Sequence, residues 1–252
     1  MIEGPKLIEV ALATGANIQA VYLDTAESTE VHLRLAEQCA ASGAKAFELQ
    51  PGVLARVCDA VTPQPIAAVV AMVDRSLAAL TEIDENAGMM ALVCVEMQDP
   101  GNAGTVLRSA GASGAGAVIF TSGSVDVYNP KSVRASAGAL FTMPAVVADV
   151  AAEDALEQLG RFGWRRLGTT PRGGCDYAEM DLSGRTALVL GNESRGLESA
   201  LASRLDAFVT IPMSGRAESL NVATAASIVC FEAARQRRAR ESGRGHVGGD
   251  QA

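Results

Sequence analysis

Short apolar segments alternate with longer helical patterns through residues 90–240, and this alternation constrains the fold more than any other feature of the sequence. The segment from Met90 to Met97 is apolar apart from one acid, as expected for a parallel strand that is buried on both faces. Strands that alternate with helices in this way form a parallel sheet with helices on both faces. The expected strands are 90–97, 117–120, 165–169, 186–190 and 208–211, and the expected helices are 103–113, 129–137, 151–162 and 220–240.

A smaller α/β pattern precedes this region, over residues 1–80. It contains no combination of groups suited to catalysis, so we interpret it as a binding or structural module. Acids, Asn86 and Gly88 indicate a linker at 81–89, a second domain follows at 90–240, and Gly, Arg and Asp at 241–252 predict a disordered tail. Within the first module the expected helices are 5–13, 29–42 and 51–58, and the expected strands are 18–23, 46–49 and 66–73.

The composition is typical of a soluble protein that stays inside the cell. Hydrophobic residues make up 48% of the 252 residues, which is enough for a large buried core. No apolar run reaches the roughly 18 residues of a membrane span, and no secretion signal is recognisable at the N-terminus. Five cysteines without a C-x-x-C pair favour reduced thiols in a cytoplasmic protein. His32 and His246 lie apart from cysteines and acidic clusters, so no metal site is expected.

The charge distribution leaves the class of partner open. A net charge of -8 argues mildly against nucleic acid, yet the positions of the basic residues matter more than the sum. Aromatic residues make up only 4% of the chain, so recognition of single strands by repeated base stacking is not expected. One basic group comprises Arg161, Arg165, Arg166 and Arg172, and a second, which a solvated helix end would also explain, comprises Arg235, Arg237, Arg238 and Arg240.

A strand-to-helix turn carries Asp99, Asn102 and Gly104. Open α/β sheets bind ligands at the carboxyl ends of their strands, and helix N-termini bind anions. A dinucleotide-binding fold fits poorly, because the glycines of residues 111–116 lie inside the helix that follows, and no carboxylate ends the next strand. A G-x-x-x-x-G-K-[ST] loop is also missing, which disfavours a triphosphatase of that type.

Two helical arginines, Arg108 and Arg134, each admit two interpretations. An isolated arginine in a helix is usually a surface residue, but its planar guanidinium can also grip a phosphate near a reacting group. The small residues 135–138 that follow Arg134 indicate close packing of its helix. A long cation beside such packing favours a functional role.

Two further loops follow strands in the second domain. The segment Gly191–Glu193 ends a strand of β-formers, and an ordinary turn with positive φ at its first or second residue would also explain it. In the later loop Pro212 fixes its own φ and Gly215 permits a bend, so backbone groups there can face an adenine ring. Ser219 is expected to be the N-cap of the next helix, with Asn221 in the first turn.

Together these segments resemble the three motifs of the SpoU/TrmH branch of the SPOUT superfamily, the knotted RNA ribose 2′-O-methyltransferases. The similarity covers residues 91–235 and is specific because all three motifs occur in order. The first motif runs from Asn102 through Arg108, the second occupies 190–197, and the third occupies 211–222. Residues 1–80 resemble the L30e-like RNA-binding module that often precedes this domain.

The resemblance implies a trefoil knot near the C-terminus, which is an exception among folds. It also implies a homodimer with its site near the subunit interface, S-adenosylmethionine held bent in the knot, and structured RNA as substrate, with ribosomal RNA favoured over transfer RNA. The small residues 223–227 suit close helix packing, either within the chain or between two copies. The implied catalytic residues are Asn102, Arg108, Glu193, Ser219 and Asn221, the implied cofactor-binding residues are Leu190, Gly191, Asn192, Ile211, Met213, Ser219 and Leu220, and the implied RNA-binding residues are Arg134, Arg165, Arg166 and Arg172.

The implied reaction is in-line attack of a ribose 2′-oxygen on the sulfonium methyl group. Arg108 would bind the phosphate next to the target ribose and organise the oxyanion. A guanidinium with a pKa above about 12 hardly deprotonates, so a phosphate oxygen or water is the expected proton acceptor. The alternative is a non-catalytic RNA-binding or ribosome-assembly protein that keeps the fold, but such a protein would not need the complete set of motif residues. An ordinary class I methyltransferase or dinucleotide enzyme would need the missing glycine loop and acidic strand end.

Overall fold

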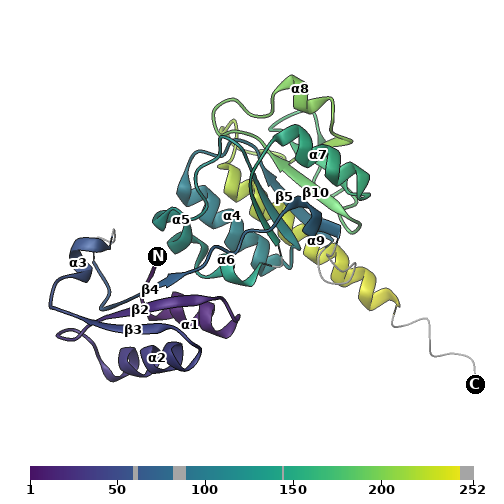
Figure 1. Cartoon of the computed structure of the whole chain (residues 1–252). Helices are drawn as coiled ribbons and strands as arrows, with labels where there is room; N and C mark the ends of the chain where they lie inside the picture. Colours follow the sequence, from purple (N-terminus) through teal and green to yellow (C-terminus); the bar gives the residue numbers. More distant parts are fainter. Residues whose placement is uncertain (59–61, 82–88, 144, 245–252) are drawn as a thin grey trace, which may run out of the picture.

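The computed structural model describes residues 1–58, 62–81, 89–143 and 145–244, and it contains one sheet in each half of the chain (Figure 1). The larger sheet has seven strands in the order β7-β6-β5-β10-β8-β11-β9, and its neighbouring strands are parallel. This confirms the predicted parallel sheet. The strands are β5 (Met90–Cys94), β6 (Ala117–Thr121), β7 (Ala145–Val150), β8 (Arg165–Thr169), β9 (Cys175–Asp176), β10 (Thr186–Leu190) and β11 (Ala207–Thr210).

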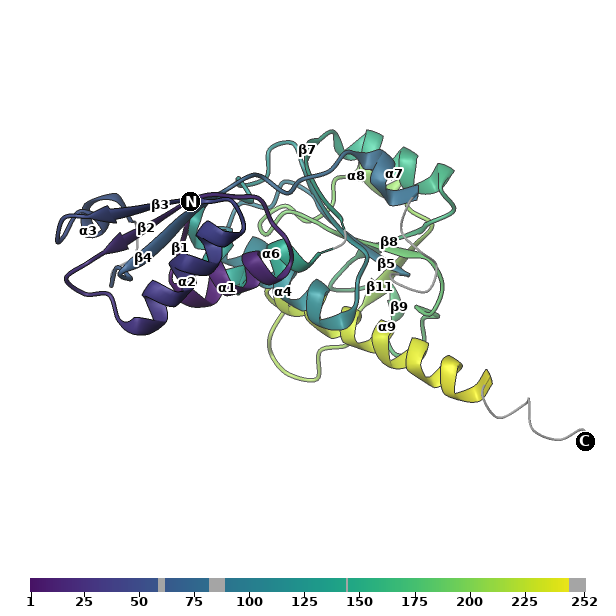
Figure 2. The ribbon, with the colours of Figure 1, turned by 60° about the horizontal axis from the view of Figure 1, so that its bottom comes forward.

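Helices cover both faces of this sheet, as predicted (Figure 2). Side chains alternate between the two faces of a strand. Leu92 of β5 therefore packs in one cluster with Leu107 and Val229, whereas its neighbour Val93 packs in another cluster with Leu156. The helices are α4 (Pro100–Ser113), α5 (Pro130–Ser136), α6 (Ala139–Thr142), α7 (Ala152–Arg161), α8 (Ser199–Ala202) and α9 (Val222–Arg244).

The N-terminal half forms a smaller, mixed sheet in the order β1-β4-β2-β3. Helices α1 and α2 pack on one of its faces, where Ile8 and Leu35 lie in the same cluster as Val21 of β2. The elements are β1 (Ile2–Glu3), α1 (Pro5–Ala13), β2 (Ile18–Asp24), α2 (Glu30–Ala41), β3 (Lys45–Leu49), α3 (Leu54–Val57), β4 (Ile66–Val70) and the 3₁₀ helix η1 (Leu77–Thr81).

Packing and one tyrosine join the two halves. The Tyr128 hydroxyl accepts hydrogen bonds from the backbone amides of Val73 at 2.9 Å and Asp74 at 2.8 Å, and it donates to the Asp74 carboxylate at 2.7 Å. A Cβ on Gly138 would lie 2.9 Å from a methyl carbon of Val10, so the start of α6 lies directly against α1. The N-terminal domain thus contacts the larger domain through β1 and α1, and β3 forms its far edge (Figure 1).

Two strands end earlier than expected. β5 ends at Cys94 rather than Met97, because the chain turns at Glu96, whose φ is +47°. β4 ends at Val70 rather than at residue 73. The strands β1, β7 and β9 were not predicted; each lies at an edge of its sheet, and β1 and β9 have only two residues each.

The last helix also differs from its expected bounds. α9 begins at Val222 rather than at residue 220 and continues to Arg244, so the expectation of a disordered tail is wrong for residues 241–244. The rest of that tail, 245–252, lies outside the described residues. Most of the expected linker, 82–88, lies outside them as well.

The close packing indicated by the small residues after Arg134 is present between α4 and α5. A Cβ on Gly104 of α4 would lie 2.9 Å from the backbone nitrogen of Ser136, and closer still to the Ser132 carbonyl oxygen and the Ala135 side chain. Glycine is therefore required at this helix crossing, because the obstacles include backbone atoms that cannot turn away.

We expect Gly104→Ala to lower the free energy of unfolding by about 1–3 kcal/mol, because the added methyl group overpacks the crossing. Gly111→Ala on the same helix is the matched control. Its Cβ would meet Ala139 at 3.5 Å, an ordinary contact, and the better helix propensity of alanine should stabilise the chain by up to about 1 kcal/mol. Urea unfolding of both variants measures the difference, and an equal loss in both would contradict the packing explanation.

The described helices are too short or too polar to cross a membrane. Four of the five cysteines are buried, and Cys175 is exposed. Among the residues with described structure, no group of three or more His, Cys, Asp or Glu side chains is arranged to hold a metal ion.

Candidate functional site

A cavity of about 700 Å³ opens at the carboxyl ends of β8, β10 and β11, beside the start of α9. Open α/β sheets bind ligands at this edge, and the volume falls within the roughly 300–1,000 Å³ of small-molecule sites. Leu190, one of the implied cofactor-binding residues, is buried below the cavity, and its carbonyl accepts a hydrogen bond from the amide of Val95 at 2.9 Å. The other implied cofactor-binding residues all line the cavity: Gly191, Asn192, Ile211, Met213, Ser219 and Leu220.

Gly191 leaves no room for a side chain. A Cβ there would lie 2.7 Å from the backbone nitrogen of Leu197 and closer to the carbonyl carbon of Gly196. The loop folds back because Asn192 and Gly196 exchange backbone hydrogen bonds of 3.1 and 2.8 Å. The positive φ of this turn, +68°, falls on Gly196, so the interpretation that placed it on Gly191 or Asn192 is wrong.

One chain of hydrogen bonds joins the three predicted motifs. The Asn102 side-chain amide donates to the Glu193 carboxylate at 3.1 Å, and the Asn221 amide donates to the Asn102 carbonyl oxygen at 2.9 Å. The Glu193 carboxylate also accepts from the backbone amides of Gln98 at 3.2 Å and Asp99 at 3.3 Å. Because Glu193 and Asn221 both line the cavity, the network lies in its wall.

The surroundings of Glu193 favour its ionised form. Partial burial raises the pKa of this carboxyl, but the hydrogen bonds from Asn102 and from backbone amides outweigh burial and hold the pKa below its ordinary value. A carboxyl whose pKa is lowered by folding stabilises the folded chain at pH values above its ordinary pKa. This stabilisation is lost as the pH falls through the lowered pKa. The network therefore keeps its charge at neutral pH.

Asn221 is the N-cap of α9, the residue directly before the first helical residue, Val222. Its side-chain oxygen accepts hydrogen bonds from the backbone amides of Ala223 at 2.9 Å and Thr224 at 3.2 Å. The expectation that Ser219 caps this helix is therefore wrong. Asparagine is as good an N-cap residue as serine, and Asn221 is the residue that lies next to the first turn. Capping also fixes the Asn221 amide toward Asn102, while Ser219 stays exposed in the cavity wall.

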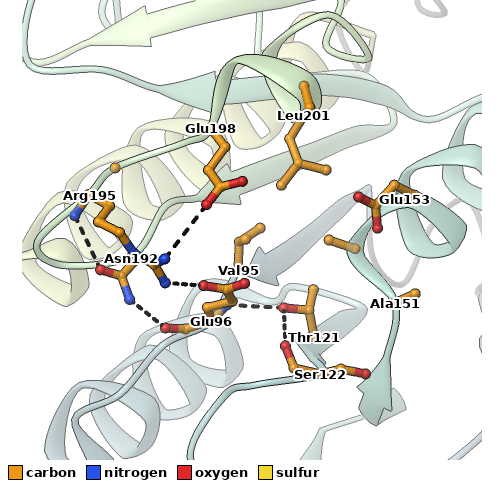
Figure 3. A pocket seen from close by; sticks show the side chains of 13 residues that line it. Val95, Glu96, Thr121, Ser122, Ala151, Glu153, Asn192, Arg195, Glu198 and Leu201 are labelled. Atoms are coloured by element: carbon orange, nitrogen blue, oxygen red, sulfur yellow. Dashed lines mark hydrogen bonds and ion pairs between the residues drawn. The ribbon is translucent and has the colours of Figure 1, made fainter.

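A second cavity, of about 230 Å³, lies beside the same loop (Figure 3). Arg195 forms an ion pair with Glu96, and the Asn192 side-chain amide donates to the Glu96 carbonyl at 2.9 Å. The Gln98 carboxamide donates to that carbonyl at 3.0 Å. Sequence reasoning missed Glu96 because it placed this residue inside the strand 90–97, and it missed Gln98, which directly follows that range. Two polar residues at the end of an apolar run were nevertheless a usable signal.

The implied RNA-binding arginines divide into two groups. Arg166 forms two side-chain hydrogen bonds with Asp206, of 3.0 and 2.8 Å, which hold the pKa of that carboxyl below its usual value. Arg165 donates to the Asp181 carbonyl at 3.0 Å, and both arginines lie at the amino end of β8, away from the cavity. Three other arginine side chains are exposed and form no hydrogen bond or ion pair with any described residue: Arg108, Arg134 and Arg172.

The larger cavity suits an organic ligand with both apolar and polar parts. Phe208, Ile211 and Met213 contribute apolar surface, and the turns contribute backbone groups and short polar side chains. The arginine in its wall, Arg195, is paired with Glu96, so a polyphosphate would find little free positive charge there. The arrangement can therefore hold a ligand of small net charge while the Asn102 network lies beside it.

Comparisons with known proteins agree with this geometry. The sequence matches the SpoU rRNA Methylase family over residues 89–231 and the MRM3-like substrate binding domain over residues 1–68. A 23S rRNA guanosine 2′-O-methyltransferase of Bacillus subtilis, RlmP, is 32% identical over 231 residues, which cover 92% of this chain and 86% of that protein. A 23S rRNA uridine 2′-O-methyltransferase of Streptomyces viridochromogenes is 39% identical over 173 residues, which cover 67% of this chain and 60% of that protein.

A solved structure is also similar over almost the whole chain. It is the SpoU methyltransferase AviRb from Streptomyces viridochromogenes in complex with the cofactor AdoMet. The TM-score is 0.80 at 30% sequence identity, and the match covers 94% of this chain and 90% of that chain.

Proposed function

The chain belongs to the SpoU rRNA methylase family, and on this premise we propose that it transfers the methyl group of S-adenosylmethionine to a ribose 2′-hydroxyl of 23S ribosomal RNA. The observation that carries the proposal is the hydrogen-bonded chain Glu193–Asn102–Asn221 in the cavity wall. A protein that only bound RNA would have no need to join all three motifs beside a ligand cavity. The two relatives are named for a guanosine and a uridine, so the base of the target differs within the family.

The residues of the larger cavity fit S-adenosylmethionine. The backbones of Gly191, Ile211, Met213 and Leu220 would hold the nucleoside, and Phe208 would supply apolar contact. The tight turn at Gly191 supports this role, since a Cβ there would displace the loop that closes the cavity. The trefoil knot implied by the resemblance would be formed by these same loops. When bound, the cofactor supplies an electrophilic methyl group on a sulfonium, and the chain supplies alignment and exclusion of water.

Five residues would carry the chemistry on the protein side. Glu193 and Asn221 hold Asn102 from both sides, so that its amide keeps one orientation while the ribose is positioned beside Ser219. The guanidinium of Arg108, which has no partner among the described residues, binds the phosphate next to the target ribose and stabilises the developing oxyanion. Since a guanidinium is a very weak base, a phosphate oxygen or water takes the proton of the 2′-hydroxyl.

The protein would work as a cytoplasmic homodimer. Phe231 on α9 is 48% exposed and supports an apolar subunit contact. The small residues Ala223 and Ala226 give no such support, because they are buried within the chain where α9 packs on α4 and Ser109 bonds Ser227 at 2.7 Å. Sedimentation equilibrium tests the subunit contact, and a monomer at every accessible protein concentration would contradict it.

The direct test is methyl transfer from radiolabelled S-adenosylmethionine to ribosomal and transfer RNA from cells that lack this protein. We expect label in one ribose of 23S ribosomal RNA, mapped by the resistance of the modified nucleotide to alkaline cleavage. Cofactor binding measured by calorimetry is the control. If the chain neither binds the cofactor nor transfers label, the non-catalytic RNA-binding alternative would be favoured.

RNA affinity should fall steeply with salt, because exposed cations release counterions from the phosphates they contact. Arg134→Ala and Arg172→Ala should each reduce the slope of log Kd against log salt by about 1. Arg161→Ala is the matched control, since Arg161 is exposed but paired with Glu157. Filter binding over a range of salt concentrations measures the slopes. If the RNA affinity of the unmodified chain did not change with salt, the proposal that exposed arginines bind RNA phosphates would be overturned.

A further inference from the structure

Two aromatic rings stack on the surface of the N-terminal sheet. Tyr22 on β2 and Phe47 on β3 are partners in register, with ring centroids 5.3 Å apart and planes 15° apart. The neighbours of Tyr22 along β2, Val21 and Leu23, belong to the core beneath α1 and α2. Because side chains alternate along a strand, the aromatic pair lies on the opposite face.

Among the described residues, the cover on that opposite face is partial. Leu54 of the short helix α3 and Cys58, which directly follows that helix, form a small cluster with Ala67, and Tyr22 packs against this cluster. Phe47 is 43% exposed, and β3 is the edge strand of its sheet. Aromatic side chains stabilise a fold or a complex most when their rings are buried. An exposed ring that stacks on an ordered neighbour is therefore suited to bind another flat group.

Exposed cations occur on β3 and on α3, the two elements next to the pair. Lys45 lies on the same face of β3 as Phe47, two residues earlier, whereas Glu48 lies on the other face. Its ammonium group is exposed and makes no hydrogen bond or ion pair with any residue whose structure is described. Arg56 on α3 is also exposed. Aromatic rings flanked by cations are the combination with which proteins bind unpaired bases and their phosphates.

The catalytic domain leaves this surface open. Domain contacts include β1 and α1, which pack against α5 and α6, and Tyr128, which bonds Val73 and Asp74 just after β4. β3 lies at the opposite edge of the N-terminal sheet, and it is remote from the larger sheet in both views (Figures 1 and 2). An RNA that touches the aromatic pair would therefore be held well away from the cavity, as the selection of a structured RNA requires.

We propose that Tyr22, Phe47 and Lys45 form a stacking platform for one unpaired base of the RNA substrate, with Lys45 on a neighbouring phosphate. The inference rests on the proposed function, because it takes the ligand to be the RNA that is methylated. Proteins read loops and bulges of structured RNA by stacking exposed bases on aromatic side chains. The low aromatic content argues against repeated stacking along a strand, but a single platform needs only these two rings.

The same features disfavour a second copy of the chain as the occupant. In a two-fold interface the same patch meets itself, so Lys45 and Arg56 would be brought toward their own copies. The repulsion between like charges would oppose that contact, whereas a polyanion neutralises both groups.

The test uses the full chain and protein-free 23S ribosomal RNA from cells that lack this protein. Phe47→Ala should raise the Kd for RNA by on the order of ten-fold and raise KM similarly, with kcat and cofactor affinity unchanged. Phe47→Trp keeps an aromatic face and should restore both values. Leu33→Ala is the matched control, because it removes an exposed apolar side chain, 45% exposed, from α2 on the other side of the sheet.

The outcomes separate this inference from the proposed function. Ultraviolet crosslinking should attach a nucleotide to the peptide that contains Phe47. If Phe47→Ala binds and methylates RNA as Leu33→Ala does, the platform is overturned. It is also overturned if Phe47→Ala changes only the sedimentation mass, because the surface would then hold a second copy. A chain that binds RNA through Phe47 but transfers no methyl group would support the platform and contradict the proposed function.

Discussion

Arg108→Ala is expected to reduce kcat for RNA methylation by about 10³-fold while the Kd for S-adenosylmethionine stays nearly unchanged. The side chain is exposed, forms no hydrogen bond or ion pair with any described residue, and does not belong to the cavity wall. Its removal should therefore cost the stabilisation of the developing oxyanion and spare both the fold and the cofactor site. Single-turnover methyl transfer and calorimetry measure the two quantities separately.

Two further variants test the role of Arg108. Arg108→Lys keeps the charge but loses the planar fork that binds a phosphate through two bonds, so it should recover only part of the rate. Arg204→Ala is the matched control, because Arg204 is likewise exposed and lies away from the hydrogen-bonded motifs. A large loss of cofactor affinity in Arg108→Ala would contradict the assignment, since the residue would then belong to the cofactor site.

Gly191→Ala should raise the Kd for S-adenosylmethionine by at least about 100-fold and abolish methyl transfer. A Cβ at this position would collide with the backbone of Gly196 and lie 2.7 Å from the backbone nitrogen of Leu197. Those atoms belong to the loop that lines the cavity, so the loop must move to admit the methyl group. Close packing without free volume makes such a shift costly.

Gly215→Ala is the matched control for this substitution. Gly215 also lies in a loop, within the third motif, its φ is not positive, and a Cβ there would meet no atom within 4 Å. It should therefore bind the cofactor as the unmodified chain does. Calorimetry with S-adenosylmethionine checks both variants, and equal affinities would show that the turn at Gly191 does not shape the cofactor site.

Much of the larger domain was predictable from local patterns. Apolar runs such as 186–190 form buried parallel strands, because each residue of such a strand faces a covered side of the sheet. The three motifs implied seven cofactor-binding residues, and six of them line one cavity in the structure. The N-terminal half was interpreted correctly as a separate α/β pattern, although its shortest edge strand was missed.

The site depended on contacts that no local pattern contains. Ser219 and Asn221 are equally good helix caps by residue type, and only the packed structure selects Asn221, whose amide then reaches Asn102. By residue type Arg165 and Arg108 cannot be distinguished. In the structure Arg165 donates to the backbone carbonyl of Asp181, whereas the Arg108 side chain has no partner among the described residues.

The sequence by itself thus determined most of the segments that become strands and helices and the order of the motifs, because these depend on residue spacing and on neighbours along the chain. Only the tertiary structure decided which polar groups meet. Glu193 and Asn102 are far apart in the chain, and their hydrogen bond exists because β10 and β5 are adjacent parallel strands whose carboxyl ends reach the same edge of the sheet.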